Sequence, residues 1–381
     1  MDRRVSYHHR YLVPVRLGIL GLGSVYWTPY RTAIERLAAA GRVEVTAAYD
    51  PDPQKRAAAD RATGAAVAVG SAEAVIEHDR VDAVLVLTSM LEHGRLALAA
   101  LEAGRHVLVE KPMATAMDEA RTLVEAAGRA SDRVLVCAPA VLLSPTYRAM
   151  HRRVAAGDVG RVVLARARYG WAGPSWGRWY YEPGGGALFD LGIYNVTSLC
   201  GLLGPVSRVV ALVGTAIPER VVEGAPIRVQ SDDNAHLLLD FGESRFASVT
   251  TGFTMQRYRS PAIELYGTDG VAQMLGDDWA PEGFELWRNA AGTWEVNPES
   301  TPGWSWTAGL DHLVDCIERG VAPVMRPEHS LHALEVMLAA ARSAAAGRAV
   351  DLETAFPPPD YSSLPPDDGG DRRVHDPRSV V

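Results

Sequence analysis

The chain has 381 residues, enough for roughly two domains of ordinary size, and 48% of them are apolar while 22% are charged. This composition is typical of a globular protein and excludes a disordered or fibrous one. The net charge is −8, and the basic residues are scattered along the chain rather than gathered into a stripe. We therefore expect no nucleic-acid partner.

The three cysteines, Cys137, Cys200 and Cys316, stand far apart in the sequence. Their number and spacing indicate neither a disulfide framework nor a zinc site, so we expect no metal and a reducing compartment. The first fourteen residues lack the apolar run of a secretory signal, and no later run approaches a membrane span. We expect a cytoplasmic protein with no membrane partner.

After an N-terminal extension of residues 1–14, short β-rich apolar runs alternate with alanine-rich segments of helical period up to residue 138. This alternation predicts a doubly wound Rossmann domain with a parallel sheet over residues 15–138. The predicted strands are Val15–Leu20, Val43–Tyr49, Ala83–Leu87, His106–Val109 and Val134–Cys137. The predicted helices are Arg31–Ala40, Gln54–Ala62, Leu91–Ala103 and Asp118–Ala130.

Residues 139–350 have a different pattern, with strands that follow one another through turns. They predict an α+β domain for substrate binding and oligomerisation, with a large, mostly antiparallel sheet and helices on one face. The predicted strands are Val162–Tyr169, His236–Phe241, Phe246–Thr251 and Ile263–Tyr266, and the predicted helices are Thr146–Ala156, Ala308–Arg319 and Glu328–Ala346. Residues 351–381 are rich in Pro and Asp, and we expect a flexible tail because the chain from Pro357 cannot bury enough apolar surface.

A Gly-x-Gly motif follows the first predicted strand. Glycines there allow a tight turn and let backbone N–H groups approach a pyrophosphate at the start of a helix. Tyr26 replaces the third glycine of the dinucleotide-binding motif, and Thr28-Pro29 resembles a helix N-cap followed by proline, so the helix is expected to begin late. The predicted pyrophosphate-binding residues are Gly21, Leu22, Gly23, Ser24 and Val25.

Asp50 ends the second predicted strand, where a carboxylate can accept both ribose hydroxyls and would repel a 2′-phosphate. NAD is therefore the preferred cofactor, and NADP stays possible because Arg56 follows closely. In the alternative reading, Asp50 is only a turn residue before Pro51.

Lysine occurs twice, at Lys55 and Lys111, whereas arginine is common. A compact ammonium group differs physically from a guanidinium fork, so each lysine is a candidate for a specific role. Lys55 lies in a polar run and is interpreted as a chance lysine on a solvated surface. Lys111 belongs to Glu110-Lys111-Pro112, directly after a predicted strand, and is expected to be functional.

A second glycine-rich motif runs from Gly184 to Tyr194 and reads GGGALFDLGIY. With Glu110-Lys111-Pro112, it makes the chain resemble, from about Val15 to Val350, the Gfo/Idh/MocA family of glucose–fructose oxidoreductase, inositol dehydrogenase and rhizopine-catabolism proteins. The resemblance implies that Lys111 lies beside the nicotinamide and substrate, and that Tyr194 is the proton donor or acceptor. Most members are similar to Asp-x-Gly-x-His here, so this chain resembles the tyrosine-bearing branch.

The same residues fit the chemistry, because hydride transfer from a carbinol needs a group that takes the hydroxyl proton. The Tyr194 phenol, whose ordinary pKa is near ~10, can serve if the Lys111 ammonium lowers that pKa. Asp190 lies one helical turn before Tyr194, on the same face of the helix. It is expected to hydrogen-bond the substrate or to adjust the pKa values of Lys111 and Tyr194. Each residue also has a structural alternative. Lys111 would then only cap the end of a strand, Tyr194 would be a core residue of an amphipathic helix, and Gly184–Gly186 would form only a flexible turn.

Further cofactor contacts are expected from Thr88, Ser89 and His93, where the family usually has Thr-Pro-Asn followed by a histidine, and from Glu110. For His93 the alternative is a position on a helix surface.

Trp171, Trp176 and Trp179 lie just before the second glycine motif. Flat aromatic faces pack against sugar rings, so we expect these side chains to bind a carbohydrate-like substrate together with Lys111 and Tyr194. A subunit interface is an equal alternative, because tryptophan is enriched there too.

The sequence thus predicts an NAD(P)-dependent dehydrogenase or reductase that acts on a CH–OH group of a sugar, polyol or related cyclic substrate. Relatives commonly form homodimers or homotetramers through the second-domain sheet, and the resemblance implies the same here. Two alternatives stay open: a redox-neutral glycosidase or lyase that oxidises its substrate transiently, and a non-catalytic NAD-sensing regulator.

Overall fold

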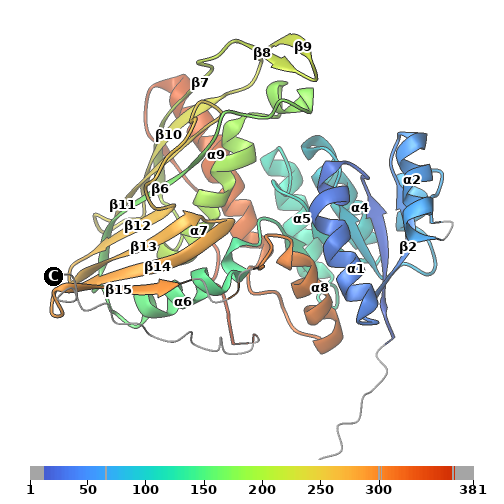
Figure 1. Cartoon of the computed structure of the whole chain (residues 1–381), viewed down its shortest axis with the longest axis horizontal. Coiled ribbons are helices and arrows are strands. Elements are labelled where there is room, and N and C mark those ends of the chain that lie inside the picture. The colour runs from blue at the N-terminus through green and yellow to red at the C-terminus, as the bar shows by residue number, and fades with distance from the viewer. Residues whose placement is uncertain (1–12, 65–66, 299–300, 302, 363, 365–381) are drawn as a thin grey trace, which may run out of the picture.

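The computed structural model describes residues 13–64, 67–298, 301, 303–362 and 364 (Figure 1). Most of the predicted N-terminal extension and the end of the predicted tail lie outside these residues.

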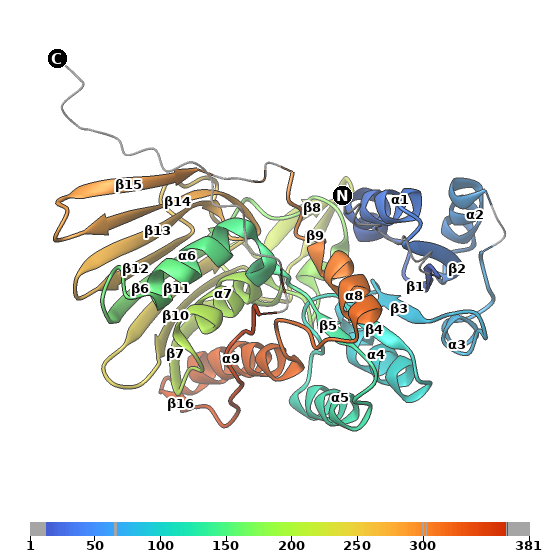
Figure 2. The same ribbon diagram turned by 90° about the horizontal axis from the view of Figure 1, so that it is seen from below.

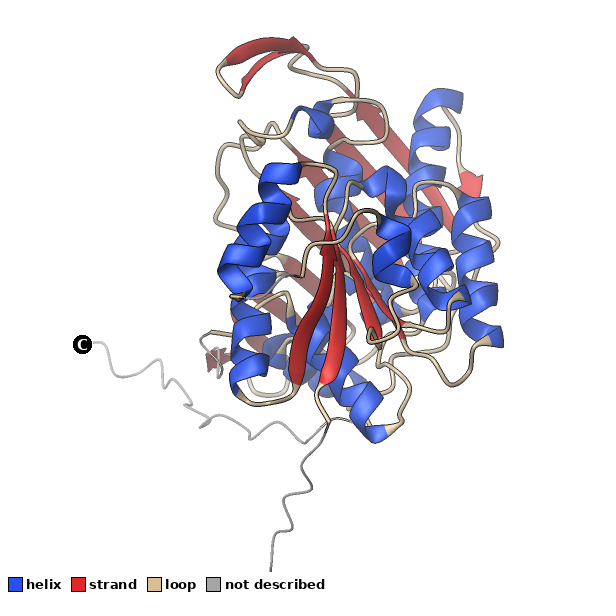
Figure 3. Ribbon diagram, turned by 90° about the vertical axis from the view of Figure 1, so that its right-hand side faces the viewer, coloured by secondary structure: helices blue, strands red, loops and turns tan. Residues whose placement is uncertain are grey.

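The described part of the first domain contains a five-stranded parallel sheet in the order β2-β1-β3-β4-β5 (Figure 3). The predicted doubly wound sheet is confirmed. The strands β1, β3, β4 and β5 are mostly buried, as expected of short apolar runs between crossover helices, and the edge strand β2 is partly buried. The strands are β1 Val15–Leu20, β2 Val43–Tyr49, β3 Ala83–Val86, β4 His106–Val109 and β5 Leu135–Cys137. The helices are α1 Arg31–Ala39, α2 Pro53–Thr63, α3 Ala72–Ile76, α4 His93–Glu102 and α5 Met117–Arg129.

A helix from late in the chain, α8 (Ala308–Arg319), also packs on this parallel sheet (Figure 2). Its Leu310 and Leu313 belong to the same buried cluster as Ile19. The Arg42 guanidinium forms ion pairs with Asp315 and Glu318 of α8, each at 2.6 Å. We retain the domain boundaries 15–138 and 139–350 as a proposal, with α8 returning to cover the first domain.

The second domain is built on a nine-stranded sheet within the described residues, in the order β15-β14-β13-β12-β6-β11-β10-β7-β16. β6 and β11 are parallel and the other neighbours antiparallel, which confirms the predicted mostly antiparallel sheet. The strands are β6 Val162–Gly170, β7 Arg208–Gly214, β10 Asn234–Asp240, β11 Phe246–Gly252, β12 Ile263–Gly267, β13 Gly270–Asp277, β14 Ala280–Arg288, β15 Thr293–Pro298 and β16 Val350–Asp351. A separate hairpin joins β8 Glu219–Val222 to β9 Ala225–Arg228.

Three helices, α6 (Pro145–Ala155), α7 (Ile193–Leu203) and α9 (Pro327–Ala346), cover the side of this sheet that faces the first domain (Figures 1 and 2). The other side, which we call the open sheet face, carries exposed apolar side chains on four neighbouring strands. These are Leu164, Val210, Leu212, Leu238 and Phe246.

The start of the predicted tail packs on α9. The Glu335 carboxylate accepts hydrogen bonds from the backbone N–H groups of Glu353 and Thr354, and Phe356 stacks on His329 at 4.2 Å between ring centroids. The chain is therefore held beyond residue 351, because Glu335 and His329 supply partners that the tail's own composition did not reveal. Within the described residues, no helix combines the length and apolar character needed to cross a membrane.

Candidate active site

The loop after β1 holds its two glycines for different reasons. Gly21 has φ +94°, and a Cβ there would lie 2.5 Å from the Leu87 carbonyl oxygen, so β1 and the end of β3 approach closely only with glycine. A Cβ on Gly23 would meet no atom within 4 Å, so Gly23 leaves open space at the start of the helix. That combination suits a bound pyrophosphate.

The helix after this loop begins at Ser24, earlier than the sequence predicted. Thr28-Pro29 is not an N-cap but lies inside a π-helical turn, Tyr26–Tyr30, that leads directly into α1. The wider turn accommodates a proline that lacks an N–H group and would clash in a regular α-helix.

A pocket of about 570 Å³ lies against this loop, at the carboxyl ends of the parallel strands. Trp179 reaches it from the second domain. The sequence-predicted cofactor residues that line it are Gly21, Gly23, Ser24, Val25, Asp50, Thr88 and Ser89.

The Asp50 carboxylate is buried and already bound by the protein. It accepts hydrogen bonds from the backbone N–H groups of Leu22 and Asp52, both at 2.9 Å. The Lys55 ammonium lies 3.6 Å from the same carboxylate and also lines the pocket. Lys55 is exposed, as the sequence predicted, and it also lies within reach of the Asp50 carboxylate.

Leu22 and His93 lie behind the pocket lining. The Leu22 side chain is buried in the core, and only its backbone N–H reaches Asp50. The His93 ring is buried, with Nδ1 2.8 Å from the Pro112 carbonyl oxygen and Nε2 3.0 Å from that of Thr88. Burial lowers the pKa of His93. His93 thus connects the loop after β3 to the loop after β4.

Glu110 is buried and fixes the backbone of the neighbouring lysine. Its Oε2 accepts a hydrogen bond from the Lys111 backbone N–H at 3.0 Å, and its Oε1 accepts one from the Tyr30 hydroxyl at 2.8 Å. Tyr30, on the π-helical turn before α1, gave no motif in the sequence and was not predicted.

Lys111, Asp190 and Tyr194 come together where the two domains meet. The Lys111 ammonium donates to Asp190 twice, to carboxylate Oδ1 at 2.5 Å and to the backbone carbonyl at 2.8 Å. The same ammonium lies 5.2 Å from the centre of the Tyr194 ring. The structure thus brings all three sequence-predicted catalytic residues into one buried cluster.

Asp190 is held in place by a π-helical turn, Leu188–Gly192, that precedes α7. Asp232 binds the start of this turn: its Oδ2 accepts from the Leu188 N–H at 2.8 Å. A Cβ on Gly186 would lie 2.2 Å from Asp232 Oδ1, so the third glycine of the motif makes room for this carboxylate. The glycine motif is therefore a packed turn, and Asp232 is a supporting residue that the sequence did not reveal.

The pKa shifts in this cluster correct one prediction. Burial disfavours the Lys111 ammonium, but the carboxylates of Asp190 and Glu110 outweigh this effect and leave the pKa of Lys111 raised. The pKa of Tyr194 is raised well above its ordinary value by burial, and next by the negative charges of Glu110 and Asp190. The sequence predicted that the Lys111 ammonium lowers the pKa of Tyr194. That prediction is wrong for the protein without bound cofactor, because burial of the phenol and the two carboxylates outweigh the ammonium.

The three predicted substrate tryptophans do not form one wall. Trp171 and Trp176 pack together at 5.5 Å between ring centroids, whereas Trp179 stacks on Tyr180 at 3.7 Å and faces the dinucleotide pocket.

A second pocket, of about 700 Å³, includes Trp171 and lies next to the catalytic cluster. Tyr169 lines it and packs edge-on against Tyr194, at 5.6 Å between ring centroids. We call it the arginine pocket, after Arg257 and Arg259 in its lining. No motif pointed to these residues.

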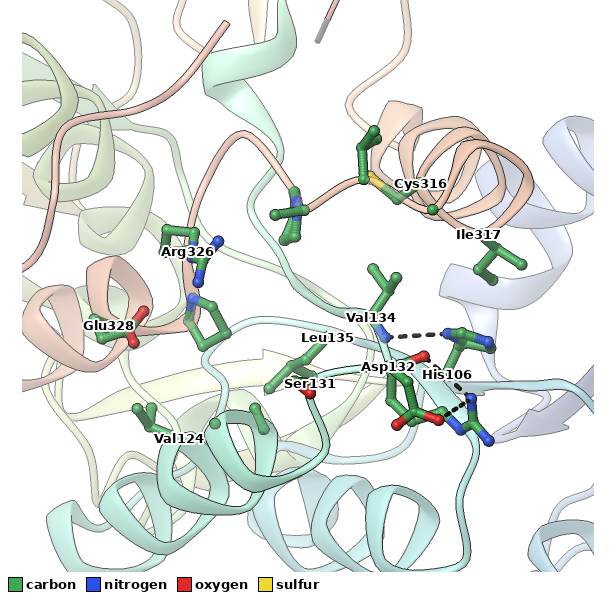
Figure 4. Close-up of a pocket in the computed structure, with 18 residues that line it drawn as sticks. His106, Val124, Ser131, Asp132, Val134, Leu135, Cys316, Ile317, Arg326 and Glu328 are labelled. Carbon is green, nitrogen blue, oxygen red and sulfur yellow. Dashed lines mark hydrogen bonds and ion pairs between the residues drawn. The ribbon is translucent and has the colours of Figure 1, made fainter. Parts of the chain in front are cut away.

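A third pocket, of about 280 Å³, lies between α5 and α8, beside the amino ends of β4 and β5 (Figure 4). His106, Asp132, Cys316 and Glu328 are among its lining residues, and no sequence-predicted site residue is. The three cysteines are free and buried, and among the described residues no group of His, Cys, Asp and Glu is arranged to hold a metal ion.

Comparison with known proteins assigns both halves of the chain to one family. Residues 15–137 match the model of the oxidoreductase family with an NAD-binding Rossmann fold, and residues 147–273 match the GFO/IDH/MocA C-terminal domain. The chain belongs to the Gfo/Idh/MocA family of oxidoreductases. The predicted family and the predicted class, an oxidoreductase with an NAD-binding domain, are thereby confirmed.

Curated relatives match over most of their length. The 1,5-anhydro-D-fructose reductase of Ensifer adhaerens is 28% identical over 320 residues, which cover 82% of this chain and 92% of that protein. The dTDP-3,4-didehydro-2,6-dideoxy-α-D-glucose 3-reductase of Saccharopolyspora spinosa is 30% identical over 270 residues, 68% of this chain and 73% of that protein. A levoglucosan dehydrogenase in complex with NADH shares the fold, with a TM-score of 0.80, 20% identity, and coverage of 90% of this chain and 100% of that one.

Proposed function

We propose that this oxidoreductase interconverts a carbinol and a ketone on a sugar, polyol or related cyclic substrate, with Lys111, Asp190 and Tyr194 as catalytic residues. The observation that carries the proposal is the Lys111 ammonium, which binds Asp190 and lies against Tyr194 near the dinucleotide pocket. Curated relatives named for anhydrofructose, levoglucosan and scyllo-inositol support this substrate class.

The residues of the dinucleotide pocket fit NAD or NADP, because Gly23 leaves open space where the helix begins and Asp50 lines the pocket at the end of β2. The nicotinamide, when bound, supplies or accepts the hydride. Gly21–Val25 would hold the pyrophosphate, Asp50 the adenosine ribose, and Thr88 and Ser89 the nicotinamide half.

We propose NAD as the preferred cofactor, because a carboxylate at the end of β2 repels a 2′-phosphate. The Lys55 ammonium beside Asp50 offsets part of that repulsion, so NADP is used with lower efficiency.

Tyr194 would serve as the proton donor when a ketone is reduced. Its raised pKa keeps the phenol protonated at neutral pH, and its hydroxyl makes no hydrogen bond with the described residues. The phenol is therefore free to donate to a substrate oxygen. The Lys111 ammonium lies close enough to stabilise negative charge that develops on that oxygen.

The test is the absorbance of reduced nicotinamide while the purified protein, with NAD or NADP, is offered inositols, aldoses, anhydrosugars and their ketones. Hydride transfer with one substrate group supports the proposal. If no substrate changes the absorbance, but products appear by mass spectrometry while NAD is not consumed, the redox-neutral alternative replaces it. NAD binding with neither result, together with NAD-sensitive capture of a partner protein, would favour the regulator.

We also propose that the chain forms a homodimer or homotetramer through the open sheet face. Val210 and Leu238 are directly opposite on neighbouring strands, as are Leu164 and Phe246, so exposed apolar side chains form a continuous patch. The cytoplasmic location stays a prediction, supported by three free cysteines.

A further inference from the structure

The arginine pocket adjoins the proposed site of proton transfer. It is formed by the end of β6, the segment 256–260 after β11, and the turn between β13 and β14. Tyr169 contributes to its lining and contacts the Tyr194 ring, so one side chain separates this pocket from the proposed proton donor. Its volume, about 700 Å³, is larger than one sugar ring requires and falls in the usual range of ligand pockets.

Two arginines in this pocket have no acidic partner in the part of the chain that the structure describes. Arg257 and Arg259 are exposed and line the pocket, and neither guanidinium makes a hydrogen bond or ion pair with the described residues. Other arginines of the same domain are engaged: Arg168 pairs with Glu264 at 3.2 Å, and Arg220 with Asp233 at 3.2 Å.

The pocket also contains two acids, with different surroundings. The Asp277 carboxylate accepts a hydrogen bond from the Tyr258 hydroxyl, whereas Glu282 is exposed. Neither acid pairs with Arg257 or Arg259, although all four side chains line one pocket. Carboxylate oxygens accept hydrogen bonds from sugar hydroxyls, and guanidinium forks bind carboxylate or phosphate through two parallel hydrogen bonds.

We propose that the substrate is an acidic sugar, and that Arg257 and Arg259 bind its carboxylate or phosphate group in this pocket. Its ring packs against Tyr169, Trp171 and Trp279, and its hydroxyls are bound by Asp277 and Glu282. This inference rests on the proposed function, because the reacting carbon of the sugar must extend past Tyr169 to reach Tyr194.

The experiment compares matched sugars: glucose with glucuronate and glucose 6-phosphate, and myo-inositol with an inositol monophosphate. Binding to the full-length protein with NAD is measured by calorimetry, and hydride transfer by absorbance. The expected result is that one acidic member of a pair binds at least about tenfold more tightly than its neutral counterpart, with affinity falling as salt rises. Preference for glucuronate indicates a carboxylate, and preference for a phosphorylated sugar indicates a phosphate.

The variants are Arg257→Gln and Arg259→Gln, singly and together, with Arg342→Gln as the matched control. Arg342 is exposed on α9 and does not line the pocket. The double variant should lose the preference for the acidic sugar while binding NAD as before, and the control should keep that preference. Equal binding of acidic and neutral sugars by the wild-type protein, or an unchanged preference in the double variant, would overturn the inference.

Calorimetry separates the two proposals. Tight binding of an acidic sugar without hydride transfer would retain the binding of its acidic group by Arg257 and Arg259 and reject the proposed function. Hydride transfer on neutral sugars, with no preference for acidic ones, would support the proposed function and reject the acidic-sugar inference.

Discussion

Lys111 takes part in both the proposed chemistry and the contact between the domains. Its side chain is 13% exposed, and its charge is stabilised by Asp190 and Glu110. A buried ion pair contributes little net stability, but removing one partner leaves the other charge uncompensated. Substitution of Lys111 therefore disturbs Asp190 as well, and Tyr194 is the better position for testing the chemistry.

Lys55 gives a prediction on cofactor choice. Replacing it with Gln should lower kcat/KM for NADP by about tenfold and leave that for NAD within about twofold, because only a 2′-phosphate needs the ammonium. Lys55→Arg is the matched control and should keep most NADP activity. Equal losses with both cofactors in Lys55→Gln would show that Lys55 supports the fold of the pocket instead.

At the residue scale, motifs predicted the catalytic cluster but not its electrostatics. Lys111, Asp190 and Tyr194 stand in motifs whose spacing is visible in the sequence. The raised pKa of Tyr194 depends on burial, to which Glu110 adds from a distant part of the chain and Asp190 from the turn just before α7. Tyr30 contacts this cluster only through tertiary packing, so no local pattern pointed to it.

Gly21 carries a prediction at the scale of one turn. Gly21→Ala should destabilise the protein by about 2 kcal/mol or more, because its φ is positive and the added Cβ would press on Leu87. Gly23→Ala should leave the melting temperature nearly unchanged and weaken NAD binding, since its Cβ would enter open space. Thermal unfolding and NAD titration of both variants test this. A stable Gly21→Ala protein that binds NAD normally would contradict the explanation.

Elements with strong periodicity were predicted well, and weakly patterned ones were missed. The strands β1 and β2 match their predicted bounds. The five-residue α3 is too short to show a helical period, and β7 and β13–β15 were not predicted. That α8 covers the first sheet follows from contacts across the whole chain, such as Leu313 packing with Ile19, which sequence pattern alone does not contain.

Three buried histidines predict a loss of stability in acid. Burial lowers the pKa of His312 and His332 to about 4 and that of His329 to about 3. In the unfolded chain their pKa is about 6.5, so stability is fully present above that pH and is lost as pH falls toward 4. At pH 5 each histidine should cost about 1–2 kcal/mol.

Urea unfolding at pH 7 and pH 5 measures this loss. The exposed His236→Asn variant should show the same pH dependence as the wild-type protein. An equal free energy of unfolding at the two pH values would contradict the assignment of neutral buried histidines.

At the scale of the whole molecule, the open sheet face predicts self-association. Leu212→Glu combined with Leu238→Glu should convert the proposed oligomer to monomers in analytical ultracentrifugation, because two charges would be buried at the contact. Val221→Glu, an exposed apolar position on the β8–β9 hairpin, is the control and should stay oligomeric. A wild-type protein that sediments as a monomer would reject the proposed contact.

The measurement that tests the central claim most directly is the single-turnover rate of hydride transfer in Tyr194→Phe, with the substrate found in the absorbance panel. The variant should be slower than the wild-type protein by about 10²-fold or more and should bind NAD with unchanged affinity. Tyr266 lies outside the site, and its hydroxyl donates a hydrogen bond to Glu264, so Tyr266→Phe should react at the wild-type rate. A normal single-turnover rate in Tyr194→Phe would contradict the account, because the proton would then be moved by another group.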